Sequence, residues 1–207
     1  MNYISTRNNQ KNFSFKDVFL KGLPDEGGLF VPKSIKPFKE EELDNLKNLS
    51  YNDLATEIIY PFIGDFMSKD DLSSMISKSY SNFRSDDVVK ISDLGDLKVL
   101  ELYHGPTLAF KDIAMQLIGN LYQHHLKQDQ KKINIIVATS GDTGAAAIDA
   151  LKGKNNLNVF VLHPNNKISP VQRRLMTIHE ESNVFNIAVE GNLSLIHISE
   201  PTRPLSI

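Results

Sequence analysis

Residues 133–144, INIIVATSGDTG, decide the fold of this chain. The first six residues form a β-branched apolar run, which is typical of a buried strand. The glycine-containing loop TSGDTG follows at 139–144, and the run AAAIDALKG comes directly after it with a helical pattern. A strand, a short glycine loop and a helix in this order are typical of the βαβ units of a parallel sheet.

The same alternation extends to both sides of this stretch. Three more apolar runs read as strands, at 98–103 (KVLELY), 158–162 (NVFVL) and 184–189 (VFNIAV). Helical patterns lie between the runs, at 112–127, 143–152 and 170–181. The last of these helices begins with Ser169 as N-cap, Pro170 in its first turn and Gln172 at the capping-box position. The pattern predicts an α/β fold with a mostly parallel sheet that includes all four runs.

The N-terminal part of the chain has a different character. Ser14 and Gly22 are typical of the start and the end of a short helix, and residues 23–32 read as a turn and a very short strand. The pattern from Lys33 to Tyr80 is helical, with Ser50 and Ser68 as candidate N-caps. Polar residues then follow, and we place a domain boundary among them. The expected domains are a small, mainly helical one at 1–85 and an α/β domain at 86–192.

Composition excludes several classes of function. The 207 residues carry a net charge of −2, so no broad basic surface points to nucleic acid or to an anionic membrane. The chain has no cysteine, which excludes disulfides and thiolate metal sites, and no histidine cluster predicts another metal site. No apolar run approaches the roughly 20 residues of a membrane helix, and no signal peptide opens the sequence. We therefore expect a cytoplasmic protein without nucleic-acid or membrane partners.

The loop at 139–144 is a candidate anion site. It places Ser140, Thr143 and several backbone N–H groups at a helix N-terminus, where unpaired donors and the helix dipole bind phosphate or carboxylate. The loop is neither a Walker A sequence nor GxGxxG. The alternative interpretation is structural: Asp142 or Thr143 caps the helix, and the glycines relieve crowding.

A second candidate site lies at 103–112, YHGPTLAFKD, between a predicted strand and a predicted helix. Lys111 stands next to the apolar Phe110, and a partly desolvated lysine amine is a nucleophile or base that can form a Schiff base. A solvated surface lysine is the alternative. Among the histidines, His104 has the best claim on this site because it directly follows the strand.

Four segments together resemble one family, the threonine synthases. They are YISTRN at 3–8, LPDEGGLFVP at 23–32, HGPTLAFKD at 104–112 and ATSGDTGAAA at 138–147. The resemblance extends from Tyr3 to about Asn192. It implies a pyridoxal-phosphate enzyme of fold type II, the class of the tryptophan synthase β subunit. The implied reaction converts O-phospho-L-homoserine and water into L-threonine and phosphate.

The resemblance also implies roles for particular residues. Lys111 would form the Schiff base with pyridoxal 5′-phosphate. The loop residues would face the cofactor and the substrate carboxylate; they are Ser140, Gly141, Asp142, Thr143 and Gly144. We further expect Ser140 and Thr143 to bind substrate, and His104 or Thr107 to assist at the substrate phosphate.

Two alternatives stay open. The first is another fold type II enzyme, of the threonine dehydratase or cysteine synthase kind, against which the N-terminal segments argue. The second is a module that binds a phosphorylated ligand without covalent chemistry.

The end of the sequence departs from the family. The family has a later glycine-rich loop around the cofactor phosphate, and residues 145–207 contain no such loop. Residues 193–207, LSLIHISEPTRPLSI, resemble a translated sequencing adapter. We expect this tail to be non-native and the native protein to be longer. The 207-residue chain should then be inactive, with apolar sheet surface exposed.

Overall fold

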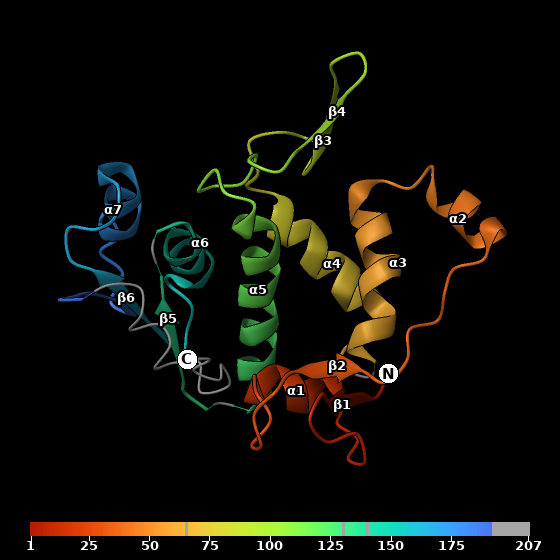
Figure 1. Cartoon of the computed structure of the whole chain (residues 1–207), viewed down its shortest axis with the longest axis horizontal. Helices are drawn as coiled ribbons and strands as arrows, with labels where there is room; N and C mark the ends of the chain where they lie inside the picture. Colours follow the sequence, from red (N-terminus) through yellow and green to blue (C-terminus); the bar gives the residue numbers. More distant parts are fainter. Residues whose placement is uncertain (65, 130, 140, 192–207) are drawn as a thin grey trace, which may run out of the picture. The chain divides into compact units, whose positions relative to one another are not determined.

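The chain forms two compact units in the computed structural model, which describes residues 1–64, 66–129, 131–139 and 141–191. The first unit comprises Met1–Ser77, and the second begins at Lys78. The domain boundary that the sequence suggests at 85 and 86 remains a prediction. The expected non-native tail at 193–207 lies outside the described residues. Figure 1 shows the elements in chain order.

The first unit is mainly helical, as the sequence predicts. Its elements are β1 (Tyr3–Ser5), α1 (Phe15–Lys21), β2 (Phe30–Pro32), α2 (Glu40–Leu46), α3 (Tyr51–Ile63) and α4 (Lys69–Tyr80), whose last turn passes the unit boundary. The strands β1 and β2 pair antiparallel. Leu72 and Ile76, four residues apart on α4, are fully buried together with Ile63 of α3. Among the described residues of this unit, they are the largest fully buried apolar side chains.

The predicted helix ends in this unit are confirmed. The Ser14 hydroxyl accepts a hydrogen bond from the backbone N–H of Asp17 at 3.1 Å, and Gly22 ends the helix with a φ of 74°. Ser50 caps α3 in the same way, through the backbone N–H of Asp53 at 3.2 Å. The caps form where the sequence places them because they depend only on residues three positions apart.

The second unit carries the candidate site. Its elements after α4 are β3 (Lys90–Asp93), β4 (Lys98–Glu101), α5 (Lys111–Asp129), β5 (Ile133–Ala138), α6 (Asp142–Leu151), β6 (Leu157–Pro164), α7 (Pro170–Thr177) and β7 (Val184–Val189). The strands β5, β6 and β7 form a parallel sheet in that order. The predicted α/β fold with a parallel sheet is therefore confirmed.

One strand does not join this sheet as predicted. The run at 98–103 gives the short strand β4, which pairs antiparallel with β3 in a separate two-stranded sheet. The turn between these strands is closed by a hydrogen bond from the Leu94 N–H to the Leu97 carbonyl at 2.9 Å, with Gly95 at a φ of 79°. Neighbouring segments joined by such a turn pair locally, and the polar sequence of β3 hides this partner from a search for apolar runs.

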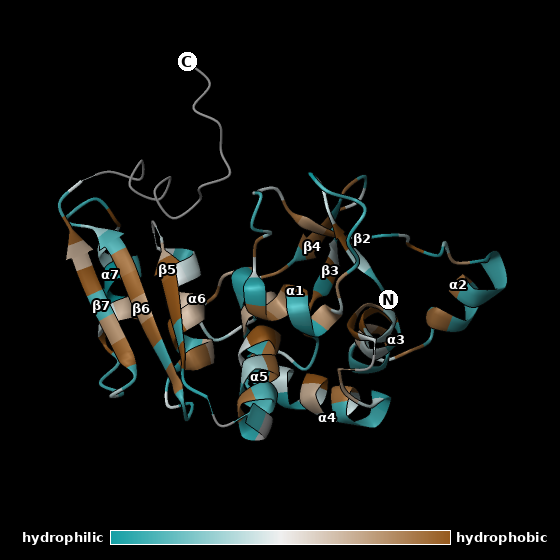
Figure 2. Cartoon of the chain, turned by 90° about the horizontal axis from the view of Figure 1, so that it is seen from below, coloured by the Kyte–Doolittle hydropathy of each residue, from teal (hydrophilic) through white to brown (hydrophobic). Residues whose placement is uncertain are grey.

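The helices α6 and α7 cover one face of the parallel sheet (Figures 1 and 2). Ile148 of α6, Met176 of α7 and Val161 of β6 are fully buried between them. On the other face Ile136 is 68% exposed, and the rings of Phe160 and Phe185 stack at 4.6 Å. Helix α7 ends at Thr177, earlier than predicted. The side chain of Asn183 then holds the start of β7 by donating to the carbonyls of Leu151 and Leu157, both at 2.9 Å.

An Ile→Ala substitution should cost more free energy of unfolding on the helix-covered side of the parallel sheet than on its open face. Ile148→Ala should lower the free energy of unfolding by about 2–5 kcal/mol, because it leaves a cavity in a packed core. Ile136→Ala is the matched control on the open face and should change it by less than about 0.5 kcal/mol. Urea unfolding of both variants measures the difference. Equal losses would contradict the assignment of α6 to the core face.

Candidate active site

Lys111 is the first residue of α5. Its amine lies over the ring of Phe110, 4.7 Å from the ring centre, and Phe110 is 57% exposed. The lysine itself is half-buried. Within the described ranges, no hydrogen bond or ion pair holds its amine. The amine is thus available to a ligand, although Phe110 shields it from water less than the sequence suggests.

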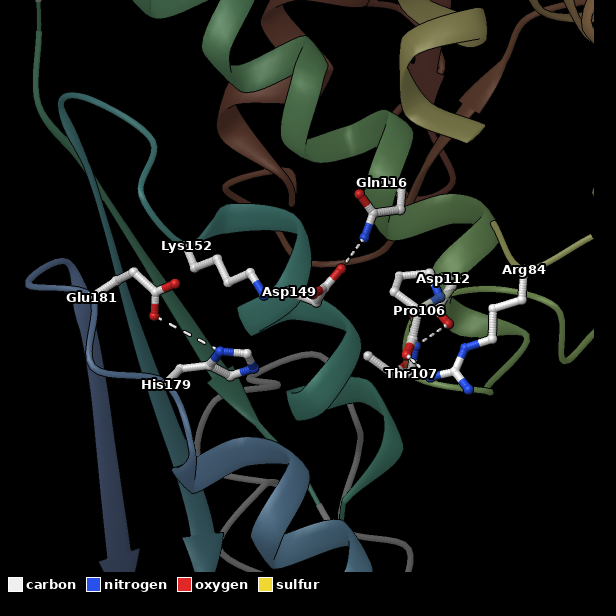
Figure 3. Close-up of polar contacts among 9 residues, drawn as sticks. All are labelled: Arg84, Pro106, Thr107, Asp112, Gln116, Asp149, Lys152, His179 and Glu181. Carbon is white, nitrogen blue, oxygen red and sulfur yellow. Dashed lines mark hydrogen bonds and ion pairs between the residues drawn. The ribbon is translucent and has the colours of Figure 1, made fainter. Parts of the chain in front are cut away.

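The neighbouring Asp112 is fully buried and organises the loop before α5. One carboxylate oxygen accepts from the Thr107 hydroxyl at 2.6 Å, and the other accepts from the Thr107 backbone N–H at 2.8 Å (Figure 3). Gly105 passes so close that a Cβ there would stand 2.4 Å from the Asp112 side chain. The hydroxyl of Thr107, a predicted substrate-binding residue, therefore donates its hydrogen bond to Asp112. The loop is folded around the Asp112 carboxylate.

Burial raises the pKa of Asp112 above its ordinary value. The hydrogen bonds from Thr107 act in the opposite direction, because they favour the ionised form, and the nearby Asp149 raises the pKa further. Burial has the largest effect, so the pKa of Asp112 is raised overall.

Arg84 fixes the other end of the same loop. Its guanidinium donates to the Pro106 carbonyl at 3.2 Å (Figure 3). Its backbone N–H donates to the His104 carbonyl at 2.8 Å. Leu108 in the loop has a φ of 61°, which is a strained conformation for a branched side chain. Strain of this kind persists only where neighbouring contacts hold it, and here Arg84 and Asp112 supply them.

The predicted site residue His104 contacts Glu101, the last residue of β4. Its Nε2 lies 2.9 Å from a Glu101 carboxylate oxygen, and both side chains are largely buried. The Ser92 hydroxyl donates to the same carboxylate and, together with bonds to Tyr103 and His104, keeps the pKa of Glu101 below its ordinary value. His104 is thus held by a carboxylate partner that the sequence did not single out.

The glycine loop is organised by Thr139, a buried residue at the end of β5. Its hydroxyl oxygen accepts from the backbone N–H of Gly141 at 3.0 Å and from that of Gly144 at 3.1 Å. Gly141 is the N-cap of α6 and makes no side-chain cap bond. The alternative that Asp142 or Thr143 caps this helix is therefore wrong, because the N-cap is Gly141 and the side chain that accepts from the Gly141 and Gly144 N–H groups is Thr139 of the preceding strand.

The first turn of α6 keeps donors available. Among the described residues, the backbone N–H groups of Asp142 and Thr143 have no hydrogen-bond acceptor. Both point out of a helix N-terminus, where the dipole favours an anion. Gly144 serves packing instead: a Cβ there would lie 2.5 Å from Thr139 Cγ2 and 2.6 Å from Met176 Sδ. Ser140, another predicted site residue, lies outside the described residues.

The two candidate regions belong to helices that pack on each other. The Gln116 side chain of α5 donates to the Asp149 carboxylate of α6 at 2.6 Å, and Asp149 also pairs with Lys152 at 2.8 Å (Figure 3). Further along, a Cβ on Gly119 would lie 2.5 Å from the Ala150 carbonyl oxygen. In the described part of the chain, no hydrogen bond or ion pair joins Lys111 directly to residues 141–144.

Neither a metal site nor a membrane span occurs in the described ranges. No group of three or more His, Asp or Glu side chains there could hold a metal ion. None of the helices found in those ranges is both long and apolar enough to cross a membrane.

Sequence reasoning missed Asp112 and Thr139 as organising residues. Asp112 ends the segment AFKD, and Thr139 opens the loop TSGDTG. A carboxylate or hydroxyl at the border between a loop and a regular element is the available signal. Only the structure shows that these two side chains are buried.

The N-terminal part of the chain matches a family model. Residues 2–80 match the model described as "Threonine synthase N terminus". A curated threonine synthase from Pseudomonas aeruginosa is 43% identical over 193 residues, which cover 93% of this chain and 41% of the relative. The chain thus spans about two fifths of the length of the curated relatives it matches.

Solved structures give the same result. The crystal structure of a PLP-bound threonine synthase from Brucella melitensis superposes with a TM-score of 0.87 at 41% identity, covering 94% of this chain and 42% of that one. The yeast threonine synthase structure also gives a TM-score of 0.87, at 40% identity, with 93% and 41% of the two chains covered. The similarity thus includes both compact units.

The raised pKa of Asp112 predicts a pH dependence. The unfolded aspartate loses its proton near pH 4, whereas folded Asp112 keeps its proton to a higher pH. Between these two values the folded state binds more protons, so Asp112 lowers stability as the pH rises. Asp112→Asn should remove this decline, which urea unfolding at several pH values measures as the difference from wild type. An unchanged decline in the variant would show that Asp112 is not the titrating group.

Proposed function

We propose that this chain, a relative of the N-terminal two fifths of threonine synthases, forms the N-terminal part of such an enzyme. The proposed reaction is the conversion of O-phospho-L-homoserine and water into L-threonine and phosphate with pyridoxal 5′-phosphate. The observation that carries the proposal is the similarity over nine tenths of the chain, which includes both Lys111 and residues 141–144. The proposal extends to fold type II for the α/β domain.

The residues present fit the cofactor and an anionic substrate. A covalent link to the cofactor requires an amine without a competing partner, and the Lys111 amine has no ion pair in the described chain. A substrate carboxylate requires hydrogen-bond donors, and the first turn of α6 offers the N–H groups of Asp142 and Thr143. The related threonine synthase from Brucella melitensis is PLP-bound, which supports the same cofactor for this chain.

Each proposed residue has a chemical task. When bound, pyridoxal phosphate supplies an electron sink for charge that develops beside the substrate nitrogen. The Lys111 amine would accept the proton from the substrate α-carbon and return protons along the side chain. The N–H groups of α6 would orient the carboxylate, and the Thr143 hydroxyl is a further donor. The phosphate group leaves from the γ-carbon, and water adds at the β-carbon.

Phosphate release from O-phospho-L-homoserine by the full-length gene product tests the reaction. Release from this substrate, with threonine as product, is the expected result. Turnover of serine or O-acetylserine alone would instead support the threonine dehydratase or cysteine synthase alternative. A protein that binds phosphate but leaves no borohydride-trapped cofactor on Lys111 would support the non-covalent binding module.

Lys111→Ala should lower kcat about 100-fold or more, because it removes the proposed proton carrier. Lys98→Ala is the control, since that lysine lies on the exposed hairpin and pairs with Asp93. The control should keep wild-type turnover. Comparable activity in the Lys111→Ala and Lys98→Ala proteins would exclude the proposed role.

Thr143→Val should raise KM about tenfold, as expected for loss of a hydrogen bond that serves a charged ligand. Asp142→Ala should also raise KM about tenfold, because it removes the acceptor through which Gln172 holds the first turn of α6. Neither side chain caps α6. The free energy of unfolding should change by less than about 0.5 kcal/mol in Thr143→Val, and by no more than about 1 kcal/mol in Asp142→Ala, which loses the hydrogen bond from Gln172. Ser50→Ala, which removes a true cap in the first unit, should cost about 1 kcal/mol and leave KM unchanged. Steady-state kinetics and urea unfolding of the three variants separate the two effects.

A further inference from the structure

Gln172, in the first turn of α7, uses both ends of its side-chain amide. The oxygen Oε1 accepts from the Ser169 backbone N–H at 3.3 Å and from the Ser169 hydroxyl at 3.1 Å. The Ser169 hydroxyl oxygen accepts in turn from the Gln172 backbone N–H at 3.2 Å, which completes a capping box. This half of the amide stabilises the start of α7.

The nitrogen end of the same amide reaches another helix. Nε2 donates to the Asp142 carboxylate at the first residue of α6, with 2.8 Å between the two atoms. Because the capping box engages Oε1, only the N–H side of the amide is directed at Asp142. One side chain therefore joins the N-termini of α6 and α7.

Gln172 also restricts which residue can occupy position 141 of the glycine loop. Gly141 has a φ of 149°, and a Cβ there would lie 2.4 Å from the side-chain amide carbon of Gln172. Only a residue without a side chain fits between the loop and this amide. Thr139 supports the loop from the strand side, so the first turn of α6 is held between Thr139 and Gln172.

We propose that Gln172 is a positioning residue for the substrate site. It holds Asp142 and the free N–H groups of the first turn of α6 in the orientation that receives the substrate carboxylate. Gln172 itself touches no reacting atom in this role. The inference rests on the function proposed above for residues 141–144.

The substitution Gln172→Glu separates the two ends of the amide. Glutamate keeps the size and the capping-box acceptor, since glutamate and glutamine both serve at this position. It replaces the donor that faces Asp142 by a second carboxylate, and two carboxylates at hydrogen-bond distance disfavour each other's ionised form. Ser169→Ala is the matched control, because it removes the cap of α7 and leaves the Gln172–Asp142 hydrogen bond possible.

Kinetics of the full-length gene product with O-phospho-L-homoserine form the first test. Gln172→Glu should raise KM by about tenfold to 100-fold, the range expected for a small displacement of a binding group. Ser169→Ala should lower the melting temperature but keep the wild-type KM. The proposal is overturned by a wild-type KM in Gln172→Glu, or by equal increases in KM in both variants.

A second test needs neither cofactor nor turnover. In the apo full-length protein, Gln172→Glu should lower the melting temperature by placing two carboxylates together. Adding Asp142→Asn restores the hydrogen bond in the reverse direction, because the amide introduced at position 142 can donate to the carboxylate introduced at position 172. The melting temperature of the double variant should therefore be higher than the sum of the two single-variant shifts predicts. Strict additivity would show that the contact does not form and would overturn the proposal.

The two tests also separate this inference from the function on which it rests. Absence of phosphate release in the wild-type protein contradicts the proposed function, and the role of Gln172 in substrate binding fails with it. Release of phosphate together with additive melting temperatures contradicts the role of Gln172 alone.

Discussion

The close approach of α6 to the sheet is the constraint on which the candidate site depends. It occurs at Gly144, where a Cβ would lie 2.5 Å from Thr139 and 2.6 Å from Met176. This approach places the Thr139 hydroxyl against the N–H groups of Gly141 and Gly144. Because Thr139 satisfies these donors, Asp142 and Thr143 need not cap the helix, and no residue in the described ranges accepts from their own N–H groups. A packing requirement of the core thus creates the free donors of the site.

A second close approach, of α5 to α6 at Gly119, joins the lysine region to the same framework. The hydrogen bond from Gln116 to Asp149 reinforces this contact nearer to Lys111. At the start of α5, the buried Asp112 holds the preceding loop by accepting hydrogen bonds from the backbone N–H and the hydroxyl of Thr107. Lys111 therefore lies on a helix that is fixed both by its packing on α6 and by the contacts of Asp112 at its start. Groups on helices are positioned more accurately than groups on loops.

The groups that organise the site are different from those proposed to act in it. Asp112, Thr139 and Gln172 each hold a neighbouring segment by two or more hydrogen bonds. The proposed ligands Lys111 and Thr143 have few contacts of their own, which leaves them available. Asp112 and Thr139 are buried. Buried polar groups that are paired make their surroundings rigid, and such rigidity preorganises a binding site before the ligand arrives.

The sequence by itself determined what depends on short range. The caps at Ser14, Ser50 and Ser169, the strands β5 and β7 and the α/β alternation all follow from residues within one turn or one strand. The tertiary structure alone decided that β4 leaves the parallel sheet, because its pairing with β3 carries no apolar signal. It also decided that Thr139 caps α6 and that Gln172 reaches Asp142 thirty residues away. Such contacts depend on which segments the fold brings together, and no local pattern encodes them.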